Sequence, residues 1–176
     1  MTFVHDMYTA WNQNMVTSAL TFNIKGIFDF VNHQHLLSEM QKRHILLEYL
    51  KWTVNFLDKC KAAICVDGIR GSSKLVKNGI PQGSPVSPIL VSFYSAGLLE
   101  VFQDANALLI PEHLKAMKPT NIGILIYVDD CKLTVFSMSI SSNITLLTEA
   151  YKIVDQWLWK AGLASNQDKH EIMHYI

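Results

Sequence analysis

The sequence lacks the features that mark a secreted or membrane protein. Its start, MTFVHDMYTAWNQN, has neither the basic nor the apolar segment of a signal peptide. No stretch reaches the roughly 18 uncharged apolar residues that a membrane span needs. The three cysteines, Cys60, Cys65 and Cys131, do not form a paired framework, and each stands in an apolar stretch that favours a small buried thiol. We therefore expect an intracellular protein, in the cytoplasm or nucleus, with no membrane partner.

The chain also lacks net charge, repeats and low-complexity tracts. Fifteen basic residues balance fifteen acidic ones, so no overall positive field draws the protein to nucleic acid, and such binding needs a local groove. What the chain has is 49% apolar residues in a length of 176, which is enough to fill one core. We expect a single domain over residues 1–176.

Apolar periodicity and turn residues predict an α+β domain with helices packed on an antiparallel sheet. Strands are expected at 20–24, 61–66, 74–77, 122–127, 132–136 and 171–176, and helices at 33–40, 45–57 and 89–102, the last largely buried. A further helix ends at Gly162 and carries the apolar stripe Ile144, Leu147, Tyr151, Val154, Leu158 and Ala161. The segment 67–71 suits a hairpin loop longer than two residues, and 104–121 suits a loop with a helical turn at 112–117.

One segment suited to chemistry is 79–88, GIPQGSPVSP, which precedes the helix at 89–102. Its glycines and prolines fix a rigid loop at a helix start, where free N–H groups and the helix dipole can face a phosphate or a sugar. A simple turn and helix cap would explain only two or three of these residues. A functional loop is therefore the favoured interpretation.

A second segment, Tyr127-Val128-Asp129-Asp130, places adjacent carboxylates at the tip of a predicted hairpin. Such carboxylates repel one another unless a cation lies between them, and Mg²⁺ is the natural candidate. Successive strand side chains point to opposite faces, so only one of the pair faces a site squarely unless the turn rotates the other. For an isolated Asp-Asp pair, a solvated acidic turn is the commoner alternative.

Together these segments resemble the Gly-(Ile/Leu)-Pro-Gln-Gly-Ser-Pro loop and the Tyr-x-Asp-Asp turn of LINE-type, non-LTR retrotransposon reverse transcriptases. Residues 22–31, FNIKGIFDFV, resemble that family's first palm motif, usually Asp-Ile-x-Gly-Ala-Phe-Asp-x-Val. Residues 157–169, with Gly162 and Leu163 before Asn166 and Lys169, resemble a later motif that ends in a lysine before a strand. Four matches in the right order imply a palm-like fold, with the fingers and thumb largely missing.

The resemblance also implies roles for particular residues. Asp129 would be the principal magnesium ligand and Asp130 its helper, and the two ions of the family activate the primer hydroxyl and neutralise the triphosphate. Lys169 would lie near the pyrophosphate and act as a general acid, although taken singly it suits a solvated lysine equally well. The turn residue Tyr127 would belong to the nucleotide and template side.

The remaining implied contacts are with the nucleotide and the template. Phe28 would pack under the incoming sugar and reject a 2′-hydroxyl, although taken singly it suits a core aromatic equally well. Gln82, with the backbone of Gly79 and Gly83, would line the nucleotide and template side. Pairs at i and i+2 lie on different faces of a helix, so His33 and His35 are not expected to be metal ligands.

The chain departs from the family at position 23, which is asparagine where the family has a metal-binding aspartate. A neutral amide is a poor bridge between divalent cations, so catalysis should lose on the order of 3 kcal/mol or more. The leading prediction is therefore a catalytically impaired fragment of an RNA-directed DNA polymerase, whose partners are an RNA template and a DNA primer and whose Mg²⁺ binding is weakened.

A rival hypothesis belongs to another class of protein. A retrotransposon-derived chain could be reused as a non-enzymatic interaction partner, and some powdery mildew avirulence proteins resemble LINE reverse transcriptase fragments and lack a signal peptide. A fungal effector that binds a host protein is a concrete form of this alternative.

Two minor expectations accompany both readings. The tryptophans (Trp11, Trp52, Trp157 and Trp159) should pack in the core rather than stack on bases, and Asn143-Ile-Thr145 should be a chance glycosylation match.

Overall fold

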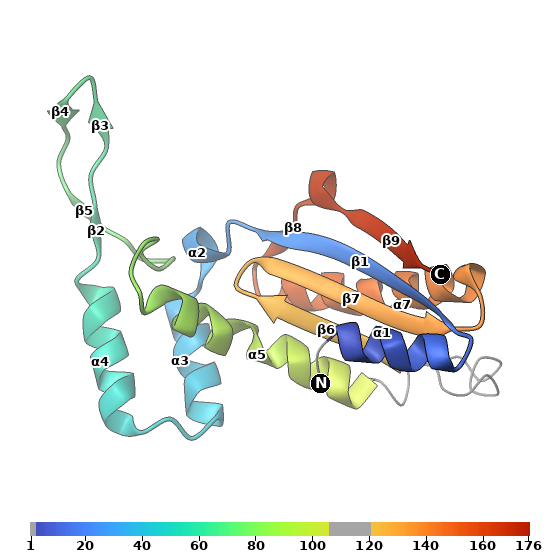
Figure 1. Ribbon diagram of the computed structural model, residues 1–176. Helices are drawn as coiled ribbons and strands as arrows, with labels where there is room; N and C mark the ends of the chain where they lie inside the picture. Colours follow the sequence, from blue (N-terminus) through green and yellow to red (C-terminus); the bar gives the residue numbers. More distant parts are fainter. Residues whose placement is uncertain (1–2, 106–120) are drawn as a thin grey trace. The chain divides into compact units, whose positions relative to one another are not determined.

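The computed structural model describes residues 3–105 and 121–176 (Figure 1). They form two compact units. The first, here called the sheet unit, runs up to Lys25 and resumes at Leu98, and the second, the helical unit, covers Gly26–Gly97. The helical turn expected at 112–117 lies outside the described residues. Within these residues, no helix is both long and apolar enough to cross a membrane.

A five-stranded antiparallel sheet forms the sheet unit, with β1 (Val16–Lys25) at its centre. On one side β1 pairs with β7 (Asp130–Ser137), which pairs with β6 (Asn121–Tyr127). On its other side β1 pairs with β8 (Ala164–Ser165) and β9 (Glu171–Tyr175). The strands predicted in this unit are confirmed, and β8 was missed. β1 is longer than expected because its first half buries small polar residues such as Thr17 and Ser18.

One face of the sheet is covered by α7 (Ile140–Lys160), which packs against β1 and β7. The hydroxyl oxygen of Ser139 accepts a hydrogen bond from Ser142 N at the start of the helix, and Gly162 follows its end at a φ of 72°. The predicted stripe is partly wrong, because Ile144 is 45% exposed. Asn143 is buried instead, since its amide donates to Val16 O and Ser18 Oγ.

The opposite face of the sheet carries α1 (Phe3–Asn12), a helix that the sequence did not predict. In Figure 1, α1 lies in front of the sheet and α7 behind it. Ala10 packs with Met15 and Phe136, and the Phe3 ring meets Tyr175 edge-on at 5.6 Å. A second contact comes from the Lys132 ammonium, 4.3 Å above the Phe3 ring. α1 thus covers the part of this face near the start of β1.

The helical unit contains α2 (Ile27–Phe30), α3 (His33–Lys42), α4 (Leu47–Asp58) and the first part of α5 (Ser87–Ala105). The predicted helices are confirmed, and the short α2 was missed. α3 begins at Asn32, whose side chain accepts a hydrogen bond from His35 N. α5 was expected to be largely buried but buries only one stripe (Ser87, Leu90, Val91, Tyr94, Ser95, Leu98 and Phe102), while Ile89 is 57% exposed.

A hairpin follows α4 and is built from β2 (Lys61–Ala62), β3 (Cys65–Val66), β4 (Ile69–Arg70) and β5 (Lys74–Leu75). β2 pairs with β5 and β3 with β4. The hairpin was predicted, but its loop length was wrong. Asp67 and Gly68 alone join the strands, at φ values of 50° and 78°, because an Asp-Gly pair accepts the left-handed backbone of a tight turn.

Two expectations about burial are corrected. Of the cysteines only Cys131 is buried, whereas Cys60 is half-buried and Cys65 is exposed on the hairpin. Trp11, Trp52 and Trp159 are 38%, 48% and 80% exposed, so core packing is wrong for these three. These tryptophans lie on the solvent sides of their helices. Hydropathy alone predicts burial for an apolar side chain and does not predict these positions. Trp52 instead stacks on Phe56 at 5.3 Å.

Candidate active site

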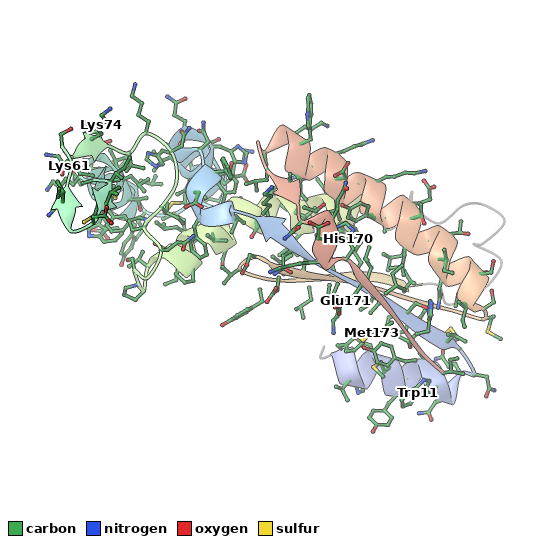
Figure 2. The ribbon with its side chains drawn as sticks, turned by 90° about the horizontal axis from the view of Figure 1, so that it is seen from above. Trp11, Lys61, Lys74, His170, Glu171 and Met173 are labelled. Atoms are coloured by element: carbon green, nitrogen blue, oxygen red, sulfur yellow. The ribbon has the colours of Figure 1, made fainter. Side chains whose placement is uncertain are left out.

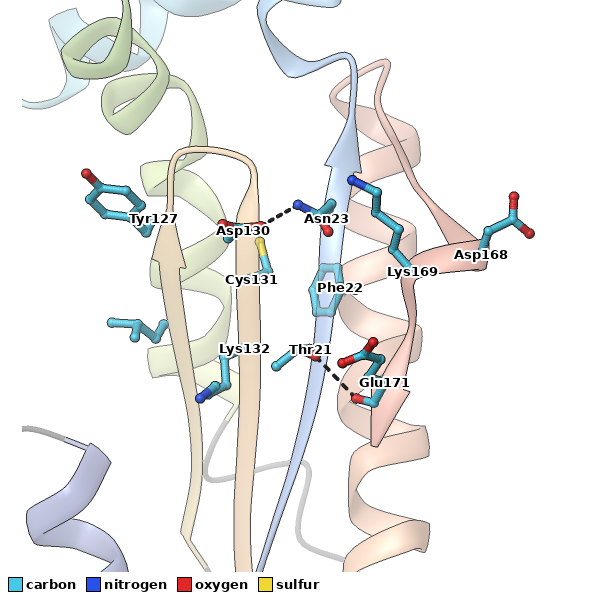
Figure 3. A pocket seen from close by; sticks show the side chains of 11 residues that line it. Thr21, Phe22, Asn23, Tyr127, Asp130, Cys131, Lys132, Asp168, Lys169 and Glu171 are labelled. Carbon is cyan, nitrogen blue, oxygen red and sulfur yellow. Dashed lines mark hydrogen bonds between the residues drawn. The ribbon is translucent and has the colours of Figure 1, made fainter. Parts of the chain in front are cut away.

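A cavity of about 580 Å³ opens on the sheet unit, and we call it the sheet cavity (Figure 3). Four residues singled out from the sequence line it: Asn23, Tyr127, Asp130 and Lys169. Asn23 comes from β1, Tyr127 and Asp130 from the ends of β6 and β7, and Lys169 from the short helix η1 (Gln167–Lys169). Thus segments from opposite ends of the sequence meet at one site.

The pleat of β1 explains which side chains reach this cavity. Ser18 and Phe22 contact α7, through Asn143 and through Tyr151, whose ring lies 5.6 Å away. Side chains alternate along a strand, so Thr21 and Asn23 point to the opposite face, where the cavity lies. Asn23 pairs in register with Asp130, which also pairs with Tyr127. Side chains on one face at paired positions are close neighbours.

The central contact of the sheet cavity joins Asn23 and Asp130. The Nδ2 atom of Asn23 donates a hydrogen bond to Oδ1 of Asp130, drawn as a dashed line in Figure 3. An ionised carboxylate only accepts hydrogen bonds, so the nitrogen of the amide must face it. Asn23 is also fixed through its backbone, since Asn166 N donates to Asn23 O at 2.8 Å. The Asn23 amide therefore places the positive end of its dipole beside Asp130. With an aspartate at position 23, two carboxylates would lie together and would need a cation between them.

The turn that carries the acidic pair is strained. Val128 has a φ of 59°, a left-handed conformation that a β-branched residue rarely adopts. Ile24 N donates to Asp129 O at 2.7 Å and ties this turn to β1. Asp130, expected as the helper, lines the cavity, whereas Asp129, expected as the principal magnesium ligand, is not among the lining residues. One of the two carboxylates thus faces the site, but it is the other member of the pair.

A second cavity of about 580 Å³ lies within the helical unit, and we call it the loop cavity. Phe28, Gly79 and Gln82 line it together, whereas Gly83 is not among its lining residues. Gly79 has a φ of 85°, and a Cβ atom there would stand 2.7 Å from Asp29 O. Gly79 N donates to Val31 O, and Ile80 N donates to Phe28 O, each at 2.7 Å. Only glycine allows the loop to lie this close to α2.

Comparison with known proteins identifies the family. The model of the family described as reverse transcriptase (RNA-dependent DNA polymerase) matches residues 1–175. The chain belongs to the reverse transcriptase family. The RNA-directed DNA polymerase from mobile element jockey of Drosophila melanogaster is 27% identical over 149 residues, and that of Drosophila funebris is 26% identical over 147. Both matches cover 84% of this chain and 15% of the relative, and they confirm the resemblance to non-LTR elements.

Solved structures support the fold of this reverse transcriptase chain. Apo telomerase from Candida tropicalis, truncated from its C-terminal domain, superposes with a TM-score of 0.66 over 98% of this chain and 35% of its own. Telomerase from Candida albicans, solved with a fragment of telomeric RNA, gives 0.64 over 98% of this chain and 31% of its own. Identities of 14% and 13% show the fold alone. The predicted palm-like α+β class is confirmed.

The donor set of the sheet cavity fits a magnesium ion poorly. Mg²⁺ requires near-octahedral oxygen ligands, and proteins usually supply one or two carboxylates with water and phosphate completing the shell. In the sheet cavity the Oδ1 atom of Asp130 already accepts the Asn23 hydrogen bond. Within residues 3–105 and 121–176, no group of three or more His, Cys, Asp or Glu side chains could hold a metal ion. A metal would first have to displace the Asn23 amide nitrogen.

Cys131 lies on the wall of the sheet cavity, next to the acidic turn. Burial raises the pKa of its thiol to about 12, and the charges of Asp130 and Asp129 contribute to the same shift. The thiol therefore stays protonated at neutral pH and is a poor nucleophile. Lys132 and Lys169 bring positive charge to the same cavity.

His33 is a positioning residue that the sequence did not reveal. Its Nε2 atom lies 2.7 Å from Gly79 O and so fastens the loop of Gly79 to α3. The His35 ring instead meets Tyr94 edge-on at 4.9 Å, so the two histidines have different partners. Ser87 Oγ adds a hydrogen bond of 2.6 Å to Pro81 O. Only the structure reveals these contacts, because the spacing of the residues carries no such signal.

Proposed function

We propose that this chain carries the palm motifs of a non-LTR RNA-directed DNA polymerase and that Asn23 strongly reduces its ability to polymerise. Its partners would be an RNA template and a DNA primer, with Mg²⁺ bound weakly. The observation that supports this reading is the hydrogen bond from Asn23 to Asp130. That contact gives the Asp130 carboxylate a hydrogen-bond donor, so a cation is no longer needed beside it. Binding a cation there would therefore stabilise the protein less.

Other features of the family remain suited to nucleotide binding. Phe28 and Gln82 line a cavity of about 580 Å³, within the range of a small-molecule site. In this proposal Phe28 supports the sugar of the nucleotide, and Gln82 with the Gly79 and Gly83 backbone contacts the nucleotide and template. Lys169 would supply positive charge near the pyrophosphate, and Tyr127 would contact the nucleotide or template. The candidate ligands for Mg²⁺ are Asp129, Asp130 and position 23, once an aspartate is restored there.

Primer extension on an RNA template with Mg²⁺ tests the proposal. The protein is compared with Asn23→Asp and with Asn23→Asp/Asp130→Asn, which restores the first residue and removes the second. We expect Asn23→Asp to exceed the unmodified protein by on the order of 10²-fold, because about 3 kcal/mol of charge stabilisation returns. The double variant should be inactive. Full activity in the unmodified protein would contradict the impairment.

A second candidate function is a non-enzymatic interaction protein, such as an effector that binds a host protein. The same hydrogen bond favours it, because a site closed by an amide is stable without metal or substrate. The extension assay separates the two readings. If Asn23→Asp is also inactive while both proteins are folded, position 23 is not the decisive lesion and the non-enzymatic reading gains support.

A further inference from the structure

Residues 59–77, here called the basic arm, include the whole hairpin that follows α4. They carry five basic side chains and one acidic one, whereas the rest of the sequence has ten basic and fourteen acidic. The chain is therefore neutral overall but positive on this one segment. The basic residues are Lys59, Lys61, Arg70, Lys74 and Lys77.

The basic arm is not held by packing against a core. Every residue from 64 to 75 is exposed, and Ile64 and Ile69 are 79% and 77% exposed. Cys65 pairs with Arg70 and Val66 with Ile69, so Arg70 and the aliphatic pair point to opposite faces of the tip. Lys61 and Lys74, labelled in Figure 2, belong to β2 and β5, which lie nearer the base of the hairpin in Figure 1.

The arm's cations have no acidic partner in the part of the chain that the structure describes. Among the described residues, none of the five makes an ion pair with a carboxylate, although Lys42, Arg43 and Lys152 elsewhere do. Clustered like charges repel one another. An external polyanion would relieve this repulsion.

The base of the arm leads into the loop cavity. Lys61, Ala62 and Val76 line that cavity together with Phe28 and Gln82. A nucleic acid strand that presents a base or nucleotide to Gln82 would therefore have its neighbouring phosphates within reach of Lys61. Lys61 pairs with Leu75 and Lys74 with Ala62, so the two lysines point to opposite faces of the hairpin. The arm therefore carries positive charge on both of its faces beyond the cavity.

We propose that the basic arm binds the sugar–phosphate backbone of nucleic acid next to the loop cavity, an inference that rests on the proposed nucleic-acid function. Lysine and arginine side chains on both strands contact phosphates. The small aliphatic side chains at the tip lie against sugars or base edges, and a two-stranded ribbon is narrow enough to enter a groove. An acidic protein also carries clustered negative charge, so it is the alternative ligand for the basic arm.

Fluorescence anisotropy tests this proposal with a labelled RNA–DNA hybrid, single-stranded RNA and duplex DNA of equal length, and with polyglutamate. The arm variant is Arg70→Gln/Lys74→Gln/Lys77→Gln. The matched control, Lys51→Gln/Lys152→Gln/Lys160→Gln, removes three exposed lysines from α4 and α7. Both remove three positive charges, so a general loss of charge affects them equally. Lys61 stays unchanged because it lines the cavity.

We expect the arm variant to bind at least one nucleic acid about tenfold more weakly than the control does. The slope of log affinity against log salt should fall by about 2 to 3 for three lost phosphate contacts, since each contributes about 0.7 to 0.9. Equal binding by the two variants would overturn the inference while leaving the proposed function intact. Absence of nucleic-acid binding in the unmodified protein would overturn both, and tighter binding of polyglutamate than of every nucleic acid would assign the arm to an acidic protein.

Discussion

The sheet cavity and the loop cavity have the same volume of about 580 Å³, but different parts of the chain define them. In the loop cavity, backbone hydrogen bonds from Gly79 and Ile80 to Val31 and Phe28 fix the wall. In the sheet cavity, the decisive contact joins two side chains, Asn23 and Asp130. A site defined by side chains can change its chemistry through one substitution while the backbone stays intact.

The exchange of aspartate for asparagine illustrates this difference. The two side chains have nearly the same shape, so the strand pairing of β1 with β7 does not depend on which is present. Their hydrogen-bonding capacity differs, because the amide can donate to a carboxylate and an ionised aspartate cannot. The loop cavity does not tolerate such a substitution at Gly79, because a side chain there would clash with the backbone of α2.

The largest effect is expected from Gly79→Ala. Both Gly79 and Gly83 have positive φ, at 85° and 87°, but only at Gly79 would a Cβ atom meet backbone, 2.7 Å from Asp29 O. We expect Gly79→Ala to lower the free energy of unfolding by about 3 kcal/mol and Gly83→Ala by about 1 kcal/mol. Chemical denaturation measures both. Equal losses would show that backbone crowding does not define the loop cavity.

A smaller effect is expected from Asn23→Asp in the absence of metal. Two carboxylates would then face each other in the sheet cavity, and their repulsion should lower the free energy of unfolding by about 2 kcal/mol. The swapped variant Asn23→Asp/Asp130→Asn again pairs a carboxylate with an amide, so it should regain most of the loss. Thermal denaturation in EDTA and in Mg²⁺ measures this. Mg²⁺ should stabilise Asn23→Asp far more than the unmodified protein, and an equal response would show that the amide does not stand in for a cation.

The sequence predicted much of the fold because its strands and helices keep regular apolar periods. It failed where polar residues are buried. β1 begins four residues before the expected strand because Thr17 and Ser18 are buried, and the α7 stripe shifts because Asn143 donates to Val16 O and Ser18 Oγ. α1 was missed because its amphipathic pattern is short and its contacts are with β1 and β9. Long-range partners determined these elements, and local pattern cannot show them.

The candidate site was predictable as a set of residues but not as an arrangement. The motif resemblance named Asn23, Asp130 and Lys169, and the structure brings them to one cavity. It also named Phe28, Gly79 and Gln82, which meet in another. The hydrogen bond between Asn23 and Asp130 and the support of Gly79 by His33 depend on strand register and loop geometry, which the motifs do not specify.

The smallest effect concerns Cys131, which lines the sheet cavity and is 3% exposed. Burial raises the pKa of its thiol from 9.0 to about 12, and the charges of Asp130 and Asp129 add to the shift. The folded protein holds this proton more tightly than the unfolded chain, so the stabilisation is complete below pH 9 and is lost as the pH rises toward 12. Between pH 8 and 10 the free energy of unfolding should therefore fall by about 1 kcal/mol more in the unmodified protein than in Cys131→Ala. Denaturation at several pH values measures this difference in slope. Parallel slopes for Cys131→Ala and the unmodified protein would mean that the thiol beside Asp130 ionises as readily in the folded protein as in the unfolded chain.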